Sequence, residues 1–203
     1  MKKFIALALT AAVSCAYAHS SELNTFLAQT KTLKADFTQT VISGKKTRTS
    51  VGTMEIERPN KFRWQYTAEQ QLIVSDAKNI YIYDKPLQQV TVKALGQSLD
   101  KSPAAVLAGA NNVQKLYAVN DIGSSKKDGL KWVEILPKAQ NDNNGFQRVA
   151  MGFTPQHQLS TMEFIDNFGN HTILKFSNLQ TGIKLPESDF KFTPPAGVDI
   201  SQQ

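Results

Sequence analysis

The chain alternates apolar and polar residues with a period of two from about residue 33 almost to its end. Because successive side chains of a β-strand point to opposite faces, this spacing predicts short strands. Turn residues such as Ser43-Gly44 and Pro59-Asn60 separate them. About eleven strands are predicted, at 33–43, 50–58, 61–67, 71–76, 79–84, 88–93, 113–119, 130–136, 146–153, 158–166 and 171–178. This arrangement favours one antiparallel meander in a curved sheet or barrel.

Two segments follow a helical period instead. The first begins at Ser20 or Ser21, either of which can cap the helix, and continues to about Thr30. The second runs from Leu95 to Ala110, and Pro103 divides it into two pieces of about two turns each. Helices that short depend on tertiary packing for their stability. The second segment can therefore be a movable cover over a cavity or a permanently docked plug.

One charge breaks the strand pattern within the stretch MEIERPNKFRWQY, residues 54–66. Met54 and Ile56 share a strand face with Arg58, whereas the glutamates beside them are predicted to face water. After the Pro59-Asn60 break, aromatic residues continue the alternation. An arginine therefore points in the same direction as the apolar residues, and this position needs a specific explanation.

The first residues have the form of a secretory signal. A basic head, MKK, precedes an apolar run that is too short to span a membrane and an A-x-A cleavage site at Ala16-Tyr17-Ala18. We predict a cleaved signal peptide over residues 1–18 and one domain, located in the periplasm, over residues 19–203. The alternative is a lipoprotein signal processed at Cys15, the only cysteine. Cleavage after Ala18 removes that cysteine, which excludes disulfide and thiol chemistry in the mature chain.

The charge balance is mildly basic. The chain has 23 Lys and Arg and 17 Asp and Glu, a formal charge of +6, and the predicted cleavage removes two lysines and leaves +4. This excess permits contact with anionic membrane surfaces but does not indicate nucleic-acid binding. The densest basic run, Lys45-Lys46-Thr47-Arg48, has no interleaved aromatic residues on which bases could stack. It is predicted to be a solvated hairpin turn.

Known catalytic motifs are missing from the sequence, including G-x-S-x-G, H-E-x-x-H and the P-loop. His157 and His171 have no metal-ligand partner at i+2 or i+4 and are predicted to be exposed turn histidines. The QNDNNG segment lacks the Glu of a calcium loop and is typical of a hairpin turn. We therefore predict a protein with no enzymatic activity, no metal site and no cofactor.

Three stretches of the chain have distinctive sequences: GTMEIERPNKFRW, which contains Arg58-Pro59-Asn60; LIVSDAKNIYIYDKPLQQV, which contains Ser75-Asp76 and Tyr83-Asp84; and the terminal FKFTPPAGVDI. Together they resemble the LolA family, the periplasmic carriers of outer-membrane lipoproteins in Gram-negative bacteria. The resemblance covers essentially the whole mature chain. Ala77 departs from the pattern, because the family usually has Gly after Ser-Asp, and this affects the turn but no ligand residue.

The resemblance implies a mainly β fold with short helices: a single-domain, incomplete (half-open), curved antiparallel β-barrel closed by a helical lid. Acyl chains of triacylated lipoproteins are expected to bind in its hydrophobic cavity, and Arg58 is expected to bond to lid backbone and hold the empty cavity shut. The expected cavity residues are Met54, Ile56, Phe62, Trp64, Leu72 and Val74, and the expected lid residues are Leu95, Leu99, Pro103, Val106 and Leu107.

The resemblance also implies partners. It implies a monomeric chaperone without a cofactor, which receives cargo from an ATP-driven, ABC-type release complex in the inner membrane and passes it to a lipid-anchored outer-membrane receptor. Two alternatives remain open. One is an outer-membrane-anchored lipoprotein acceptor of the same fold, which requires lipidation of Cys15. The other is a periplasmic carrier of another lipid.

Overall fold

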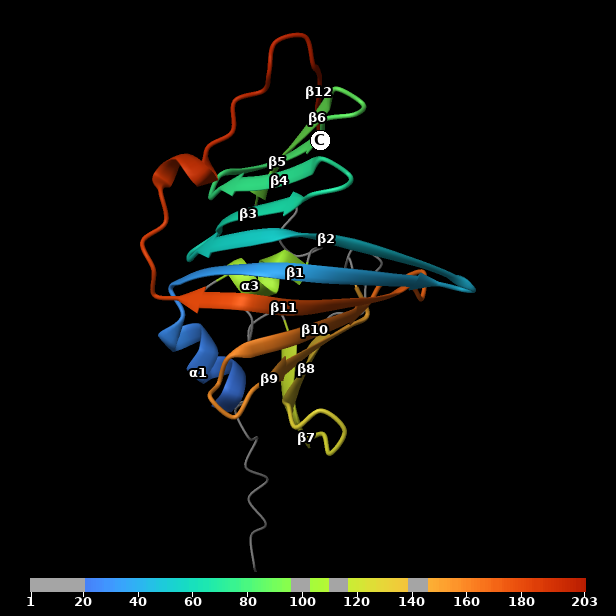
Figure 1. Cartoon of the computed structure of the whole chain (residues 1–203), viewed down its shortest axis with the longest axis vertical. Helices are drawn as coiled ribbons and strands as arrows, with labels where there is room; N and C mark the ends of the chain where they lie inside the picture. The colour runs from blue at the N-terminus through green and yellow to red at the C-terminus, as the bar shows by residue number, and fades with distance from the viewer. Residues whose placement is uncertain (1–20, 96–102, 110–116, 139–145) are drawn as a thin grey trace, which may run out of the picture.

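The computed structural model of the chain describes residues 21–95, 103–109, 117–138 and 146–203. Within these residues, twelve strands form one curved sheet that stays open (Figure 1). The strand order is β12-β6-β5-β4-β3-β2-β1-β11-β10-β9-β8-β7, so β12 and β7 are the two edges. The pairing is antiparallel except between β12 and β6, which run parallel. The predicted half-open, mainly β fold is confirmed.

The strands are β1 (Thr32–Ser43), β2 (Lys46–Glu57), β3 (Lys61–Tyr66), β4 (Gln71–Asp76), β5 (Asn79–Asp84), β6 (Gln89–Ala94), β7 (Tyr117–Ser124), β8 (Lys131–Pro137), β9 (Arg148–Phe153), β10 (Leu159–Ile165), β11 (His171–Thr181) and β12 (Asp199–Gln202). The helices are α1 (Ser21–Gln29), α3 (Pro103–Ala108) and the 3₁₀ helix η2 (Glu187–Phe190). The prediction missed β12, whose four residues are all exposed and show no apolar alternation.

The face of the sheet that carries Met54 and contacts both α-helices is called the inner face below. Phe26 of α1 packs against Phe153 of β9, with 5.5 Å between ring centroids, and α3 contacts β2 and β3. Figure 1 shows α3 behind β1 and β2. The main hydrophobic core therefore lies between the inner face and the two helices. None of the helices in the described ranges is long and apolar enough to cross a membrane.

The C-terminal segment covers part of the opposite, outer face. Phe190 of η2 is buried, and η2 contacts β3 and β4. The Phe192 ring lies 5.6 Å from the rings of both Tyr81 and Tyr83 on β5. This cover explains why the LIVSDAKNIYIYD stretch is apolar on both faces, since an antiparallel sheet normally buries only one.

Candidate functional site

Four of the predicted cavity residues lie together on the inner face. Cross-strand pairs point to the same side of a sheet, and the register pairs Ile56 with Phe62 and Met54 with Trp64. Each of the four side chains is at most 6% exposed. The period-two pattern of residues 54–66 therefore placed these four side chains on one buried face correctly, and their role in a lipid cavity remains a proposal.

Two predicted cavity residues, Leu72 and Val74, lie on the outer face, so their assignment to the cavity was wrong. The register pairs Leu72 with Gln65 and Val74 with Arg63, whereas Ile73 pairs with Trp64 and occupies the inner face. A one-residue difference in register moves every side chain of a strand to the other face. Because both faces of this run are apolar, its sequence carried no signal that distinguishes them.

Sequence reasoning overlooked Phe37 of β1, although Leu33, Ala35 and Phe37 alternate with polar residues. The Phe37 ring lies on the inner face, 5.0 Å from Trp64 and 5.2 Å from Tyr66 between ring centroids. It covers Gly52 on the neighbouring strand, where a Cβ atom would clash with the Gln65 carbonyl oxygen and lie 2.7 Å from Phe37 Cζ. Gly52 is therefore required for this aromatic cluster, which continues the wall beyond Trp64.

The predicted lid helix is docked against this wall. Val106 and Leu107 of α3 are at most 1% exposed, and Leu95 is also buried in the core. Pro103 is the first residue of α3, as predicted, whereas Leu99 lies outside the described residues. A six-residue helix has too few internal hydrogen bonds to be stable alone, so its position depends on these contacts.

Arg58 connects three elements at this end of the inner face. Its Nε donates to the Leu107 carbonyl of α3 over 2.8 Å, and its Nη1 donates to the Thr30 carbonyl after α1. Its guanidinium carbon lies 4.9 Å from the ring centroid of Phe26, a cation–π distance. Burial lowers the pKa of Arg58 to about 10, and Nη2 has no hydrogen-bond partner among the described residues. The expected contact with lid backbone is present, and its role as a latch remains a proposal.

The backbone beside Arg58 makes a second connection to the lid. The Asn60 N–H donates to the Ala108 carbonyl over 2.9 Å, so two successive carbonyls at the C-terminus of α3 accept bonds from this turn. The turn includes a cis Arg58-Pro59 peptide bond and Asn60 at φ 67°. Ser75 Oγ donates to the Asn60 carbonyl over 2.7 Å. Two of the three stretches that resemble the family, GTMEIERPNKFRW and LIVSDAKNIYIYDKPLQQV, are thus joined by the hydrogen bond between Asn60 and Ser75.

Three ionisable side chains attach α1 to the sheet. Glu22 is 7% exposed, and its two carboxylate oxygens each lie 2.5 Å from a partner, Lys131 Nζ and His157 Nδ1. Burial acts to raise the pKa of Glu22, but hydrogen bonds from Lys131 and His157 outweigh it and lower that pKa. His157 lies in a turn, as predicted, but the prediction that it is exposed was wrong, because the residue is half-buried and contacts a carboxylate 135 residues away in the sequence.

Two smaller sequence predictions also need correction. His171 is half-buried, and its Nε2 lies 3.3 Å from Glu163 Oε2 on the neighbouring strand. Glu55 was expected to face water, but it is 8% exposed and forms a 2.6 Å ion pair with Lys34 on the outer face. In both cases the partner comes from another strand, which the local pattern does not reveal.

Comparisons with known proteins agree with these features. The family model described as "Outer membrane lipoprotein carrier protein LolA" matches residues 28–193. An outer-membrane lipoprotein carrier protein of Dechloromonas aromatica (strain RCB) is 44% identical over 182 residues, covering 88% of this chain and 85% of the relative. One from Cupriavidus pinatubonensis (strain JMP 134 / LMG 1197) is 37% identical, and the match covers 100% of both chains. A crystal structure of an uncharacterized conserved protein from Thermus thermophilus has a TM-score of 0.57 at 10% identity, covering 91% of this chain and 99% of that one.

Proposed function

The chain belongs to the LolA family of outer-membrane lipoprotein carrier proteins, and we propose that it binds the acyl chains of lipoproteins between its inner face and α3. Proteins of this family are chaperones and not enzymes. In the proposal, residues 1–18 direct the chain to the periplasm. There it takes lipoproteins from an ABC-type release complex of the inner membrane and delivers them to an outer-membrane receptor.

The observation that carries the proposal is how α3 is held. The inner face beneath it is aromatic and aliphatic, but the hydrogen bonds to α3 come from the Arg58 side chain and the Asn60 backbone, both at its C-terminal end. Carbonyls at a helix C-terminus carry partial negative charge and suit a cation. Among the described residues, breaking these bonds would leave α3 only the apolar contacts of a very short helix, so it can move away without unfolding the sheet.

Acyl chains supply the driving force for that movement. Each Å² of apolar surface removed from water contributes about 25 cal/mol, so lipid chains that replace Val106 and Leu107 against the wall compensate for the lost contacts of the helix. A docked α3 lowers the apparent affinity, because cargo binds only the undocked population. That penalty favours release to the receptor, so a moderate latch suits a carrier better than a permanently open cavity.

The direct test uses purified protein covering residues 19–203 and spheroplasts whose inner membrane holds labelled lipoprotein. Lipoprotein should appear in the supernatant in complex with the added protein, and only when that protein is present. A matched control replaces Phe62 and Met54 by Asp, which places charges on the inner face and should abolish release. If wild-type protein releases no more lipoprotein than buffer does, the proposed function is wrong.

A further inference from the structure

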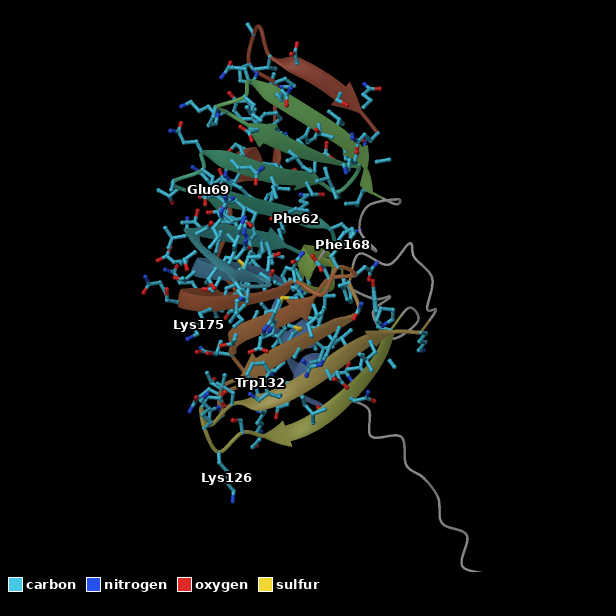
Figure 2. All side chains as sticks on the ribbon, turned by 90° about the vertical axis from the view of Figure 1, so that its right-hand side faces the viewer. Phe62, Glu69, Lys126, Trp132, Phe168 and Lys175 are labelled. Carbon is cyan, nitrogen blue, oxygen red and sulfur yellow. The ribbon has the colours of Figure 1, made fainter. Side chains whose placement is uncertain are left out.

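A groove with a volume of about 660 Å³ lies toward the turn between β1 and β2. Its lining includes Gln39, Lys46, Arg48, Ser50, Tyr66 and Glu69. Gln39 pairs with Ser50, and Tyr66 pairs with Gly52 beneath Phe37, so these residues belong to the inner face. Figure 2 looks onto this end of the molecule and labels Glu69. The groove is thus the polar continuation of the apolar wall.

Tyr66 marks the boundary between the two regions. Its ring packs edge-on against Phe37, which in turn contacts Trp64, and its hydroxyl donates to Gln39 Oε1 over 2.9 Å. Ser50 in the groove and Arg58 at the α3 end of the inner face are eight residues apart in the chain, a distance of at most about 26 Å along extended backbone. A ligand lying along the inner face would therefore have α3 at one end and polar side chains at the other.

Two polar atoms at this boundary have no hydrogen-bond partner among the described residues. Trp64 is 6% exposed, and its buried indole Nε1 lies near the Tyr66 hydroxyl and lowers the pKa of that group, but it has no acceptor with hydrogen-bond geometry among the described residues. Glu69 accepts from Ser50 Oγ through Oε1 and is close to its own backbone N–H, but its buried Oε2 has no partner in another described residue. Buried polar groups are nearly always paired in native proteins, because an unpaired one costs about 1–3 kcal/mol. A ligand that supplies an acceptor and a donor would satisfy both atoms.

We infer that this groove binds the polar head of the cargo, the ester and amide groups that join the acyl chains to the first residue of the lipoprotein. This inference rests on the proposed function. Trp64 Nε1 donates to a carbonyl oxygen where the acyl chains begin, and Glu69 Oε2 accepts from an amide N–H of the head or the following residue. The acyl chains then lie along the wall toward α3, and the peptide leaves near the β1–β2 turn.

The groove chemistry favours this head over that of a phospholipid. A phospholipid has ester carbonyls that suit Trp64, but the group next to them is a phosphate, which has no N–H and would be repelled by the Glu69 carboxylate. The ammonium of an ethanolamine head can donate to Glu69 only from beyond that phosphate. The pKa of Glu69 is lowered, chiefly by the hydrogen bond from Ser50, so the carboxylate is charged at neutral pH. Lys46 and Arg48 would attract a phosphate instead, and the experiment below therefore includes phospholipid as a separate ligand.

The test measures binding of a fluorescent triacylated lipopeptide to full-length mature protein, next to an analogue whose ester carbonyls are replaced by ethers. Trp64→Phe keeps the ring and removes only the N–H, and we expect it to weaken lipopeptide binding roughly tenfold and leave the analogue unchanged. Glu69→Gln should weaken binding of the lipopeptide and of the ether analogue several-fold, because both ligands retain the amide N–H that Glu69 would accept. Trp132→Phe is the matched control on the outer face, beside Gly152, and should change neither (Figure 2).

Equal loss of both ligands in Trp64→Phe would indicate damaged packing and overturn the inference, as would unchanged lipopeptide binding. Thermal unfolding of each variant identifies packing damage independently. A phospholipid that competes with the lipopeptide at equal affinity, with the same dependence on Trp64, would also overturn it. If the wild-type protein binds no lipopeptide at all, the proposed function itself fails, whereas normal wild-type binding with an insensitive Trp64 variant removes only the head-group site.

Discussion

Replacing Arg58 by leucine should favour the open, lipid-bound form of the protein without unfolding the sheet. The substitution removes the charged hydrogen bond from Nε to the Leu107 carbonyl, which is the only side-chain hydrogen bond to α3 found in the described residues. The Asn60 N–H bond to Ala108 remains. The bond to Thr30 is lost as well, but it ties Arg58 to the end of α1 and does not hold the lid.

The size of the effect follows from these contacts. A hydrogen bond to a charged group contributes about 1.5–3 kcal/mol, and new apolar contacts of leucine with α3 return about 1 kcal/mol of that. A net loss of about 0.5–2 kcal/mol should therefore raise the undocked population about 2- to 30-fold, and acyl-chain affinity should rise with it. Overall stability should change little. The pKa of about 10 corresponds to a desolvation cost of at most about 3 kcal/mol, reduced further by partial solvent exposure, and that cost disappears with the charge.

Two measurements check the reasoning. Hydrogen exchange at residues 106–109 should become faster in Arg58→Leu, and a fluorescent lipopeptide should bind more tightly and transfer to a receptor more slowly. Arg63→Leu is the matched control, because Arg63 lies on the outer face of β3 and donates to the Asp189 carbonyl. If Arg58→Leu matches the Arg63 control in exchange, affinity and transfer, the contact with Leu107 is not a latch.

Three further predictions concern stability. Ala77→Gly should raise the unfolding temperature measured by calorimetry by about 1–4 °C. Ala77 adopts φ +72°, a conformation that costs an L-residue about 1–2 kcal/mol, and glycine removes that cost. The greater entropy of glycine in the unfolded chain offsets part of this gain. Glu22→Gln should cost about 1–3 kcal/mol at pH 7, because the bonds from Lys131 and His157 stabilise the carboxylate and lower the pKa of Glu22. The difference should shrink as the pH falls below the ordinary value of 4.5 and through the lowered pKa, where the folded carboxylate protonates. Phe190→Ala should lower the free energy of unfolding in denaturant by about 3–5 kcal/mol and expose the C-terminal segment to protease. Lipopeptide affinity should stay the same, because Phe190 packs on the outer face. A parallel loss of affinity would contradict the assignment of this face from the strand register.

Local periodicity predicted most elements of the fold because each element has a surface to bury. The strands between residues 32 and 94 follow the period-two pattern closely, and α1 buries the residues that its helical spacing selected, Leu23 and Phe26. β12 could not be predicted in this way. Its residues are exposed, with Ile200 at 55%, and it is held by parallel backbone pairing with β6, a contact without a sequence pattern.

Pairing between distant segments limited the prediction of the site. The assignment of Leu72 to the cavity failed because the β3–β4 turn fixes the register, and neither face of β4 is polar enough to indicate which one is covered. The ion pairs of Glu22 and Glu55 join residues 109 and 21 positions apart, respectively. Arg58 was different: its position in line with Met54 and Ile56 was visible locally, because a charge on an apolar face is itself a signal.

The partly unsatisfied state of Arg58 explains why a charge suits this position better than an apolar residue. A leucine would hold α3 by apolar contact alone, and that contact competes with acyl chains of the same chemistry. Arginine instead bonds to backbone carbonyls, which acyl chains cannot replace, but its Nη2 has no partner in the part of the chain that the structure describes, and its pKa is lowered. The desolvation cost offsets much of the hydrogen-bond energy. Under the proposed function, the docked helix is therefore favoured by only a small margin, which would allow cargo both to open the site and to leave it.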